Sequence, residues 1–358
     1  MNQPSNLPSS RERMLAAARR EPLPGRPPGW VMRQAGRYLP EYRALREGKR
    51  FLEMVHAPEI AAELTCQPLR RFDMDAAVIF SDILVPPAAM GMDVHFEEGR
   101  GPVLENPVRD ADDVRRLVDF DARKATGFLA ESIRRVRQEL GDEKAIVGFA
   151  GAPFTVASYM IEGGSSKNFE HTKRIAFGEP ETFTRLLERI VDNQLGYLAM
   201  QAEAGADVLQ VFDSWGGNLD AATWRKLVLP PTKRLIEETQ RATGAPVILF
   251  VNGASHLIEV MLETGADVLG IDHRVDPADA IRRIGGAAAI QGNLDHCVLF
   301  APPEVVARET ERVLAAFEGA AGHIFNLGVG ILPQTPVTSM SVVFDTLRAH
   351  GARATKRA

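Results

Sequence analysis

The sequence repeats one pattern along most of its length: a short apolar run, a polar or glycine-rich turn, and then a longer amphipathic stretch. Strands buried on both faces are apolar almost throughout, and the helices that connect parallel strands show one apolar face. The joint between such a helix and the next strand occurs twice in nearly the same form, as GADVLQVF and as GADVLGID. This alternation predicts an α/β protein with a parallel sheet and helices packed on its outer face.

Eight apolar runs qualify as strands of this sheet, and eight such units predict a single-domain (β/α)8 TIM barrel. A doubly wound open sheet is the alternative. No G-x-G-x-x-G sequence follows an early strand, which disfavours a dinucleotide-binding sheet of that kind. The expected strands are WVMRQ (30–34), AAVIF (76–80), AIVGF (145–149), VLQVF (208–212), PVILFV (246–251), VLGID (268–272), AAIQG (288–292) and HIFNL (323–327).

The chain has 358 residues, a length that α/β barrels reach as one domain, and no Pro-, Gly- or Ser-rich linker divides it. We therefore expect one barrel domain over residues 1–358. Ser9-Ser10 followed by RERMLAAARR predicts a capped helical extension before the barrel. The segment 85–108 predicts an excursion after the second strand with a hairpin in it, and residues 1–9 and 350–358 are expected to be flexible.

Composition excludes several classes of protein. The formal net charge of −5 gives no reason to expect nucleic-acid binding, so positive charge that meets an anionic ligand must be local. Cys66 and Cys297 are far apart in sequence and predict neither a disulfide framework nor a cysteine-based metal site. The N-terminus lacks the apolar region of a signal peptide, and no apolar run approaches the roughly 18 residues of a membrane span. The sequence predicts a cytoplasmic protein.

The carboxyl ends of the expected strands are where a barrel carries its catalytic groups. They show no metal triad, no G-x-S-x-G turn and no cysteine nucleophile, which disfavours a zinc enzyme or a conventional hydrolase. The paired arginines Arg33 and Arg37 suggest a substrate with carboxylates or phosphates, because the planar guanidinium binds both. Each candidate also has an ordinary structural reading: a surface loop for the arginines, a helix cap for Asp82, packing for Tyr159, and a turn for Asp213-Ser214.

Five segments carry a resemblance to a known family: RQAGRYLPEYR, FSDILVPPAAMGM, GFAGAPFTVASYMIEGG, QGNLD and HIFNLGVGILPQTP. Together they resemble uroporphyrinogen decarboxylase of haem biosynthesis, in order from about Arg11 to about Ala349. The resemblance implies a homodimeric barrel with its active site at the carboxyl ends of the strands. It also implies a carboxy-lyase that converts the four acetate side chains of uroporphyrinogen III to methyl groups, giving coproporphyrinogen III without a cofactor or metal.

The resemblance also implies roles for individual residues. Arg33, Gln34 and Arg37 would bind substrate carboxylates, Asp82 would accept hydrogen bonds from the pyrrole N–H groups, and Tyr159 and Ser214 would contact carboxylate side chains. The implied catalytic residues are Asp82, Arg33, Arg37 and Tyr159. The implied substrate-binding residues are Arg33, Gln34, Ala35, Gly36, Arg37, Phe51, Phe80, Asp82, Tyr159, Phe212, Ser214 and Val329.

The chemistry fits these roles. Loss of carbon dioxide needs an electron sink, and a pyrrole protonated at its α-carbon provides one, so the substrate does what a cofactor would otherwise do. A carboxylate such as Asp82, fixed in a partly dry site, stabilises the resulting cation better than water does.

One position departs from the family pattern. The family has histidine in NLGHG, whereas this chain has Val329 in NLGVG. Either that histidine only orients a substrate carboxylate, or this chain is a catalytically impaired, tetrapyrrole-binding member of the family. His296 and His273 replace residues that are usually proline and tryptophan, and His296 could reach the same rim. A corrinoid-linked methyltransferase on this barrel would need a zinc site with cysteine ligands, and only Cys297 lies in that region.

Overall fold

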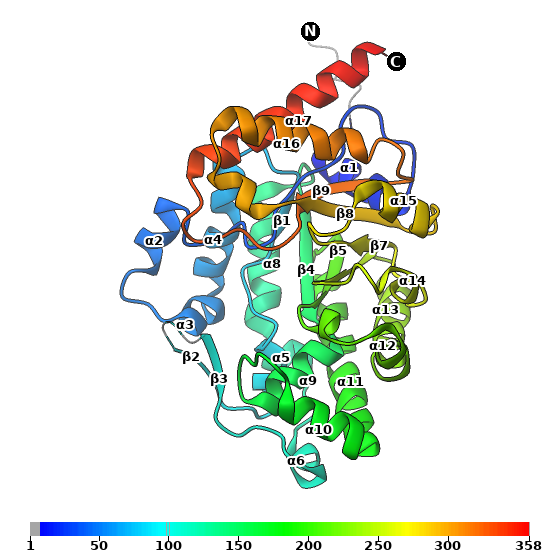
Figure 1. Cartoon of the computed structure of the whole chain (residues 1–358). Coiled ribbons are helices and arrows are strands. Elements are labelled where there is room, and N and C mark those ends of the chain that lie inside the picture. The colour runs from blue at the N-terminus through cyan, green and yellow to red at the C-terminus, as the bar shows by residue number, and fades with distance from the viewer. Residues whose placement is uncertain (1–7, 98, 100, 358) are drawn as a thin grey trace.

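The computed structural model describes residues 8–97, 99 and 101–357, without the side chains of residues 354–357. Seven parallel strands form one curled sheet in the order β1-β4-β5-β6-β7-β8-β9 (Figure 1). Strands that follow one another in the sequence are therefore neighbours in the sheet, which is the arrangement of the expected (β/α)8 barrel. The strands are β1 (Ala76–Val78), β4 (Ala145–Gly151), β5 (Val208–Asp213), β6 (Val247–Val251), β7 (Val268–Gly270), β8 (Ala289–Leu294) and β9 (His323–Leu327), and the separate hairpin is β2 (Val94–Glu97) with β3 (Gly101–Leu104).

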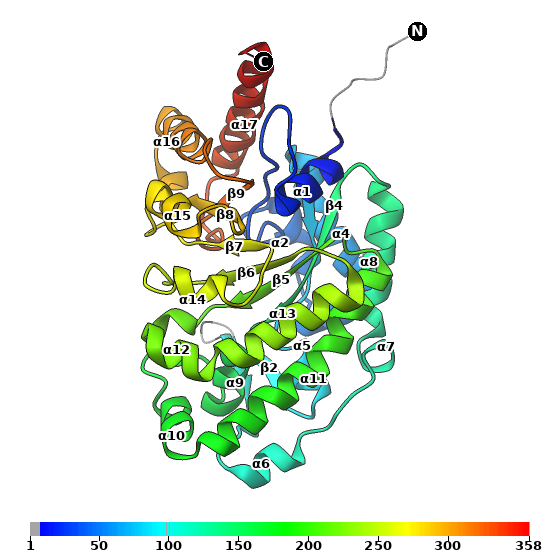
Figure 2. The same cartoon turned by 90° about the vertical axis from the view of Figure 1, so that its right-hand side faces the viewer.

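Most of the helices lie on the outer side of the sheet, whereas α1 (Ser10–Arg19) covers one end of it (Figures 1 and 2). Their apolar faces pack on the outward residues of the strands in one large core cluster. The helices of the described chain are α1 (Ser10–Arg19), α2 (Pro40–Arg46), α3 (Phe51–His56), α4 (Pro58–Arg71), α5 (Val85–Ala89), α6 (Ala111–Arg116), α7 (Ala122–Ala125), α8 (Gly127–Leu140), α9 (Pro153–Glu162), α10 (Glu170–Gly178), α11 (Pro180–Ala204), α12 (Ala221–Leu227), α13 (Leu229–Thr243), α14 (Ile258–Leu262), α15 (Pro277–Ile284), α16 (Pro303–Ala316) and α17 (Val337–Arg357), with the 3-10 turns η1 (Gly216–Asn218) and η2 (His296–Phe300).

The first expected strand, WVMRQ (30–34), is wrong as a strand. The chain makes only an isolated parallel bridge there, between Gly29 and Phe325 of β9. The Trp30 N–H donates to the Phe325 carbonyl at 3.2 Å, and on the other side the Asp75 N–H donates to the Gly29 carbonyl at 2.9 Å. The segment thus lies between β9 and β1 and closes the barrel where an eighth strand would stand.

The local sequence explains why this ladder stays so short. Pro27 and Pro28 come just before the bridge and have no N–H to donate. A tight turn follows at once, with the Gln34 N–H donating to the Val31 carbonyl at 3.1 Å. Between prolines and turn, too few residues remain for a regular strand.

A buried ion-pair cluster holds this closing segment. The Asp75 carboxylate is fully buried, accepts the Gly29 N–H at 2.7 Å, and pairs with Arg13 at 3.0 Å and with Arg26. Arg26 is itself only 8% exposed. Buried charges of this kind are stable only as partners of one another, so the three side chains act as a unit.

Helix α1 is the expected capped helix and closes one end of the barrel. The Ser9 hydroxyl accepts the Glu12 N–H at 3.2 Å, and the Glu12 carboxylate accepts the Ser9 N–H at 2.7 Å. Met14 and Ala17 join the apolar cluster inside the barrel. Gly322, just before β9, leaves room for this helix, because a Cβ there would lie 2.3 Å from the Ala17 carbonyl oxygen. The amino ends of the strands are thereby covered, and the opposite ends remain for a site.

Three further expectations concern the segment 85–108, the two ends of the chain and membrane spans. The hairpin in the segment 85–108 is confirmed as β2 and β3. Residues 350–357, expected to be flexible, continue helix α17, whereas residues 1–7 and 358 lie outside the described residues. Over the described part of the chain, no helix is long and apolar enough to cross a membrane.

Candidate active site

Three predicted residues meet at the carboxyl ends of the strands. Asp82 follows β1, Tyr159 lies on α9 after β4, and Arg33 lies in the turn after the closing segment. Burial raises the pKa of Asp82, and the positive charge of Arg33 partly offsets this rise; burial and then the negative charge of Asp82 raise the pKa of Tyr159. These groups therefore share one electrostatic environment although the sequence separates them widely.

Among these three residues, Asp82 is a carboxylic acid with a raised pKa. Asp82 is partly buried, and burial raises its pKa to about 6 against the smaller opposing effects of the Leu84 N–H and Arg33. The Leu84 N–H donates to Oδ1 at 2.9 Å, which is a helix-start contact and fixes the side chain. The cap predicted as an alternative for Asp82 is wrong, because α5 has Leu84 at its N-cap and no side-chain cap, so this contact is a turn before the helix. The contact leaves the second carboxylate oxygen for a ligand.

Tyr159 sits in an aromatic corner beside this carboxylate. Burial and then the nearby Asp82 charge raise the pKa of its phenol, so it is a hydrogen-bond donor across the physiological range. Its ring centroid lies 5.7 Å from that of Trp215, which lies 5.2 Å from that of Phe169. Trp215 packs on the Tyr159 ring and is itself supported by Phe169, which restricts the direction of the tyrosine hydroxyl.

A buried carboxylate fixes the turn that carries Ser214. Asp213 at the end of β5 is fully buried, and its pKa is raised to about 6 by burial. Its Oδ1 accepts the Thr155 hydroxyl at 2.5 Å and the Gly216 N–H at 3.1 Å, and the Trp215 N–H donates to the Thr155 hydroxyl at 3.0 Å. Thr155 and Tyr159 are four residues apart on α9, so the same helix face positions the turn and the tyrosine.

Arg33 and Arg37 lie on a rigid turn with free guanidinium groups. Arg33 has a left-handed backbone, with φ 64°, and the Arg43 guanidinium donates to the Arg37 carbonyl at 2.8 Å. Both side chains are exposed, and within the described chain neither guanidinium forms an ion pair or hydrogen bond. The Arg33 side chain crosses Gly330, where a Cβ would come within 2.7 Å of its Cδ. A constrained backbone with two unpaired arginines is suited to an anionic ligand.

Gln34 lies in the seam of the barrel and not with these arginines. Its side chain is only 1% exposed. Its Oε1 accepts the Val31 N–H at 3.1 Å, and its Nε2 donates to the Ala76 carbonyl at 2.9 Å. The side chain therefore replaces a missing ladder contact between the closing segment and β1. Ala35 and Gly36 are partly exposed between the two arginines.

The predicted aromatic residues form two groups of rings. Phe51 lies 5.4 Å from Phe80 and 4.7 Å from Phe96 of the hairpin, measured between ring centroids. Phe212 lies 5.5 Å from Phe149 at the end of β4. Phe96, like Trp215, was not predicted, since nothing in its local sequence distinguishes a hairpin phenylalanine that packs on a distant helix.

Several polar residues at the strand ends are structural. Asp272 is fully buried, accepts the Gly253 N–H at 2.7 Å and pairs with Arg274 at 2.8 Å. The Asn293 amide donates to the Asp272 carbonyl at 3.0 Å. These side chains bind backbone and one another, so their position at strand ends does not make them ligand-binding residues. Asn252 belongs with them, since its Oδ1 accepts from Arg274 at 2.8 Å.

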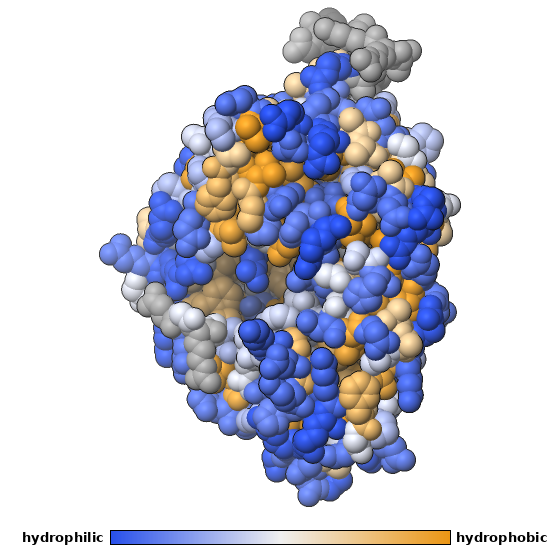
Figure 3. Space-filling model, in the orientation of Figure 1, coloured by the Kyte–Doolittle hydropathy of each residue, from blue (hydrophilic) through white to orange (hydrophobic). Residues whose placement is uncertain are grey.

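The turn after β9 carries Val329 between two tightly packed glycines. Gly328 packs on His273, since a Cβ there would lie 2.2 Å from the His273 nitrogen, and Gly330 packs on Arg33. Val329 is partly buried. The structure also brings His273 together with His296 and Asp295, a group that could hold a metal ion and that was not predicted from the sequence. The space-filling view shows a hollow near the centre of the face seen in Figure 1 (Figure 3).

Comparison with known proteins gives one consistent result. The family model described as uroporphyrinogen decarboxylase (URO-D) matches residues 9–350. A uroporphyrinogen decarboxylase of Myxococcus xanthus is 45% identical over 340 residues, covering 95% of this chain and 97% of that protein. One from Thermus thermophilus is 46% identical over 339 residues, covering 95% and 98%. Among solved structures, a methyltransferase from Methanosarcina mazei has a TM-score of 0.78 at 19% identity, covering 95% of this chain and 98% of that one, which shows a common fold.

Proposed function

The chain belongs to the uroporphyrinogen decarboxylase family, and from this we propose that it is a carboxy-lyase that decarboxylates uroporphyrinogen III to coproporphyrinogen III. Four acetate side chains lose their carboxylates as carbon dioxide and become methyl groups, with no cofactor. The observation that carries the residue roles is the meeting of Asp82, Arg33 and Tyr159 in one electrostatic environment at the carboxyl ends of the strands.

The steps follow from the charges of these groups. A proton adds to the α-carbon of a pyrrole, the carbon–carbon bond to the carboxylate breaks, and its electron pair flows into the cationic ring as carbon dioxide leaves. A second proton then converts the exocyclic carbon to a methyl group, and loss of the ring proton restores the pyrrole. Asp82 accepts hydrogen bonds from the pyrrole N–H groups and stabilises the cation, because the Leu84 N–H holds its charge in a fixed position.

The remaining residues position the substrate. Arg33 and Arg37 bind acetate or propionate carboxylates, for which their unpaired guanidinium groups are available. Tyr159 and Ser214 donate to further carboxylates, and Phe51, Phe80 and Phe212 offer apolar surface to the macrocycle. Guanidinium and phenol groups hold their protons too tightly to be good acids near neutral pH. Asp82, with its pKa of about 6, is better matched to proton exchange.

Turnover by the purified protein tests this function. Uroporphyrinogen III incubated anaerobically without added metal should yield the seven-, six- and five-carboxylate intermediates and then coproporphyrinogen III, separated by chromatography. If none of these products forms, the proposal is wrong. Binding of coproporphyrinogen without any turnover would instead support the tetrapyrrole-binding alternative that Val329 motivates.

The rate should depend on pH through Asp82. Its pKa is raised to about 6, so the carboxylate form is present above that pH and is lost as the pH falls through it. We expect log kcat/KM to rise with unit slope up to about pH 6 and then to level off. Initial rates from about pH 5 to 8 measure this dependence. The Asp82→Asn variant should keep a low residual activity whose kcat/KM no longer rises with pH over this range. A flat profile in the native protein would contradict the role given to Asp82.

Restoring a histidine at position 329 should strengthen binding more than chemistry. A hydrogen bond from an imidazole to a substrate carboxylate contributes about 1.5 kcal/mol when charged, so Val329→His should lower KM by about tenfold with kcat little changed. Val329→Leu is the matched control and should leave both constants near native values. A rise in kcat comparable to the fall in KM would instead show that the native chain lacks a group that acts in the chemical step.

We further propose that the protein acts as a cytoplasmic homodimer without a nucleic-acid partner, which the resemblance implies. Light scattering should then give twice the chain mass of 39.2 kDa. A corrinoid-linked methyltransferase is not favoured, because the family model and the relatives point to decarboxylation, and the likeness to the methyltransferase structure concerns the fold.

A further inference from the structure

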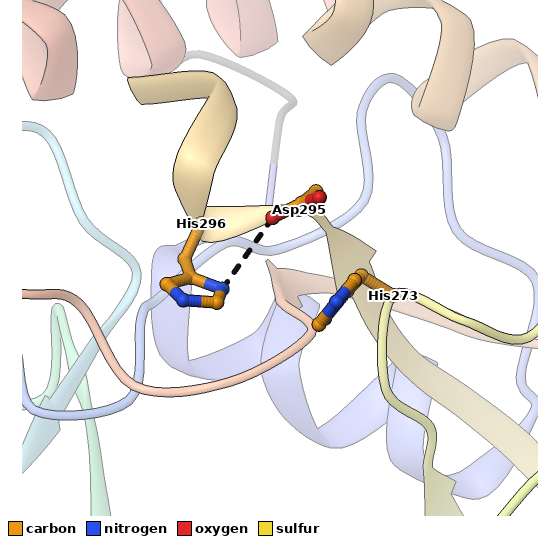
Figure 4. Close-up of side chains that lie close together, drawn as sticks. All are labelled: His273, Asp295 and His296. Atoms are coloured by element: carbon orange, nitrogen blue, oxygen red, sulfur yellow. Dashed lines mark ion pairs between the residues drawn. The ribbon is translucent and has the colours of Figure 1, made fainter. Parts of the chain in front are cut away.

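Two neighbouring strands bring three potential metal ligands to one rim of the barrel. His273 follows β7, and Asp295 and His296 follow β8, so parallel pairing alone places them at the same edge. One ligand atom from each residue lies within 4.8 Å of the other two. Figure 4 shows the three side chains facing a common space, with the His296 ring turned toward Asp295.

The ring nitrogens are free to bind. Nδ1 of His273 and Nδ1 of His296 are both shielded from solvent, and neither has a hydrogen-bond partner within the described chain. Nδ1 of His296 lies 3.5 Å from Oδ1 of Asp295, and Nε2 on the other edge of this ring lies 3.6 Å from the Cys297 sulfur. If Nε2 carries the proton and directs it to the sulfur, Nδ1 has the free lone pair that a metal requires.

The backbone under these side chains is fixed. Oδ1 of Asp295 accepts the Cys297 N–H at 2.8 Å, which caps the turn η2. His273 is packed against Gly328 so closely that a Cβ on the glycine would lie 2.2 Å from its nitrogen. A ligand set on strand ends and a capped turn needs only side-chain rotation to close around an ion.

We propose that His273, Asp295 and His296 bind one divalent transition-metal ion, for which Zn²⁺ is the best match. Two imidazoles and one carboxylate suit zinc, whereas Mg²⁺ and Ca²⁺ prefer oxygen ligands alone. Zinc bonds of about 2.0–2.1 Å place tetrahedral ligand atoms roughly 3.3 Å apart, so the three side chains must move inward slightly. Three protein ligands leave a fourth position open to a water molecule or an added carboxylate.

Metal titration tests the site directly. The full-length protein, freed of metal by chelator and dialysis, should take up one equivalent of Zn²⁺ in competition with a chromophoric chelator. Co²⁺ should give the visible absorption of a four- or five-coordinate ion. His273→Ala and His296→Ala should each weaken Zn²⁺ binding at least about 100-fold, since even partners outside the first shell contribute 10–100-fold. His171→Ala removes an exposed histidine from α10 and should bind as the native chain does.

A second variant separates the ligands from their support. Cys297→Ala should keep the single equivalent but weaken it by about 10–100-fold, because the sulfur only orients the His296 ring. Circular dichroism confirms that each variant is folded. Failure of the native protein to take up Zn²⁺, or equal uptake by the His273 and His296 variants, would overturn the proposal. Neither result bears on the decarboxylation assay, which is run without added metal.

Discussion

Replacing Asp82 by asparagine should lower kcat for uroporphyrinogen decarboxylation by about 10²–10³-fold, the usual loss when a preorganised charged group is removed from a transition state. Asparagine keeps the shape of the side chain, and its Oδ1 can still accept the Leu84 N–H that now lies at 2.9 Å. What it removes is the negative charge that balances the protonated pyrrole. KM should change much less, because the uncharged substrate pyrrole gains little from that charge before protonation.

The same variant should be more stable than the native protein at neutral pH. The pKa of Asp82 is raised in the folded state, so folding favours the protonated form and stability falls as the pH rises from about 4 to about 6. Asparagine cannot ionise and removes that penalty. Steady-state kinetics and thermal denaturation measure the two effects, with Asp142→Asn, an exposed carboxylate, as the control. A decarboxylation rate within tenfold of the native rate would refute the assignment of Asp82.

Replacing Asp75 by alanine should destabilise the fold by about 3–5 kcal/mol, the range for breaking a buried ion pair. Arg26 would be left buried without its partner, and the Gly29 N–H would lose its acceptor. Both changes affect the segment that closes the barrel. A second substitution in the same cluster should therefore not add its full cost to that of Asp75→Ala. Urea denaturation with a fitted midpoint and slope measures the change in the free energy of unfolding.

A surface ion pair supplies the comparison for Asp75→Ala. Glu263→Ala breaks an exposed pair with Arg225 at 2.7 Å and should change stability by less than about 1 kcal/mol. If Asp75→Ala costs no more than this control, the cluster under the closing segment does not hold the barrel together.

Much of the fold could be predicted from periodicity. The apolar runs and glycine-ended helices locate seven strands correctly, and the serine cap locates α1. The remaining prediction, a strand over WVMRQ, was wrong. This segment has the composition of a strand, but its neighbours in the sequence prevent it from forming a ladder. Pro27 and Pro28 remove donors on one side, and the left-handed Arg33 turns the chain on the other. That outcome depends on backbone geometry that hydrophobic patterns do not record.

The residues of the candidate site remain a prediction from motifs, and their electrostatics could not be predicted from the sequence. Motifs named Asp82, Arg33 and Tyr159, whereas the raised pKa of Asp82 needs the surroundings that only the folded chain supplies. The meeting of His273 with His296 could have been inferred, because residues that directly follow adjacent parallel strands share one edge. The burial of Gln34 could not, since a glutamine beside two exposed arginines gives no sign that its amide completes a sheet.

That amide has a consequence for how ligand binding and folding are related. The residue that joins the closing segment to β1 is flanked by the Arg33 and Arg37 turn, so one short stretch of chain both shuts the barrel and presents the anion-binding groups. Loosening at the join would let the arginines move apart, and an anion bridging them would resist that loosening. By mass action, substrate bound there stabilises the closed barrel by the same free energy with which closure favours its binding. In the ligand-free protein the barrel should therefore open first at the closing segment between β9 and β1, and bound substrate should oppose this opening.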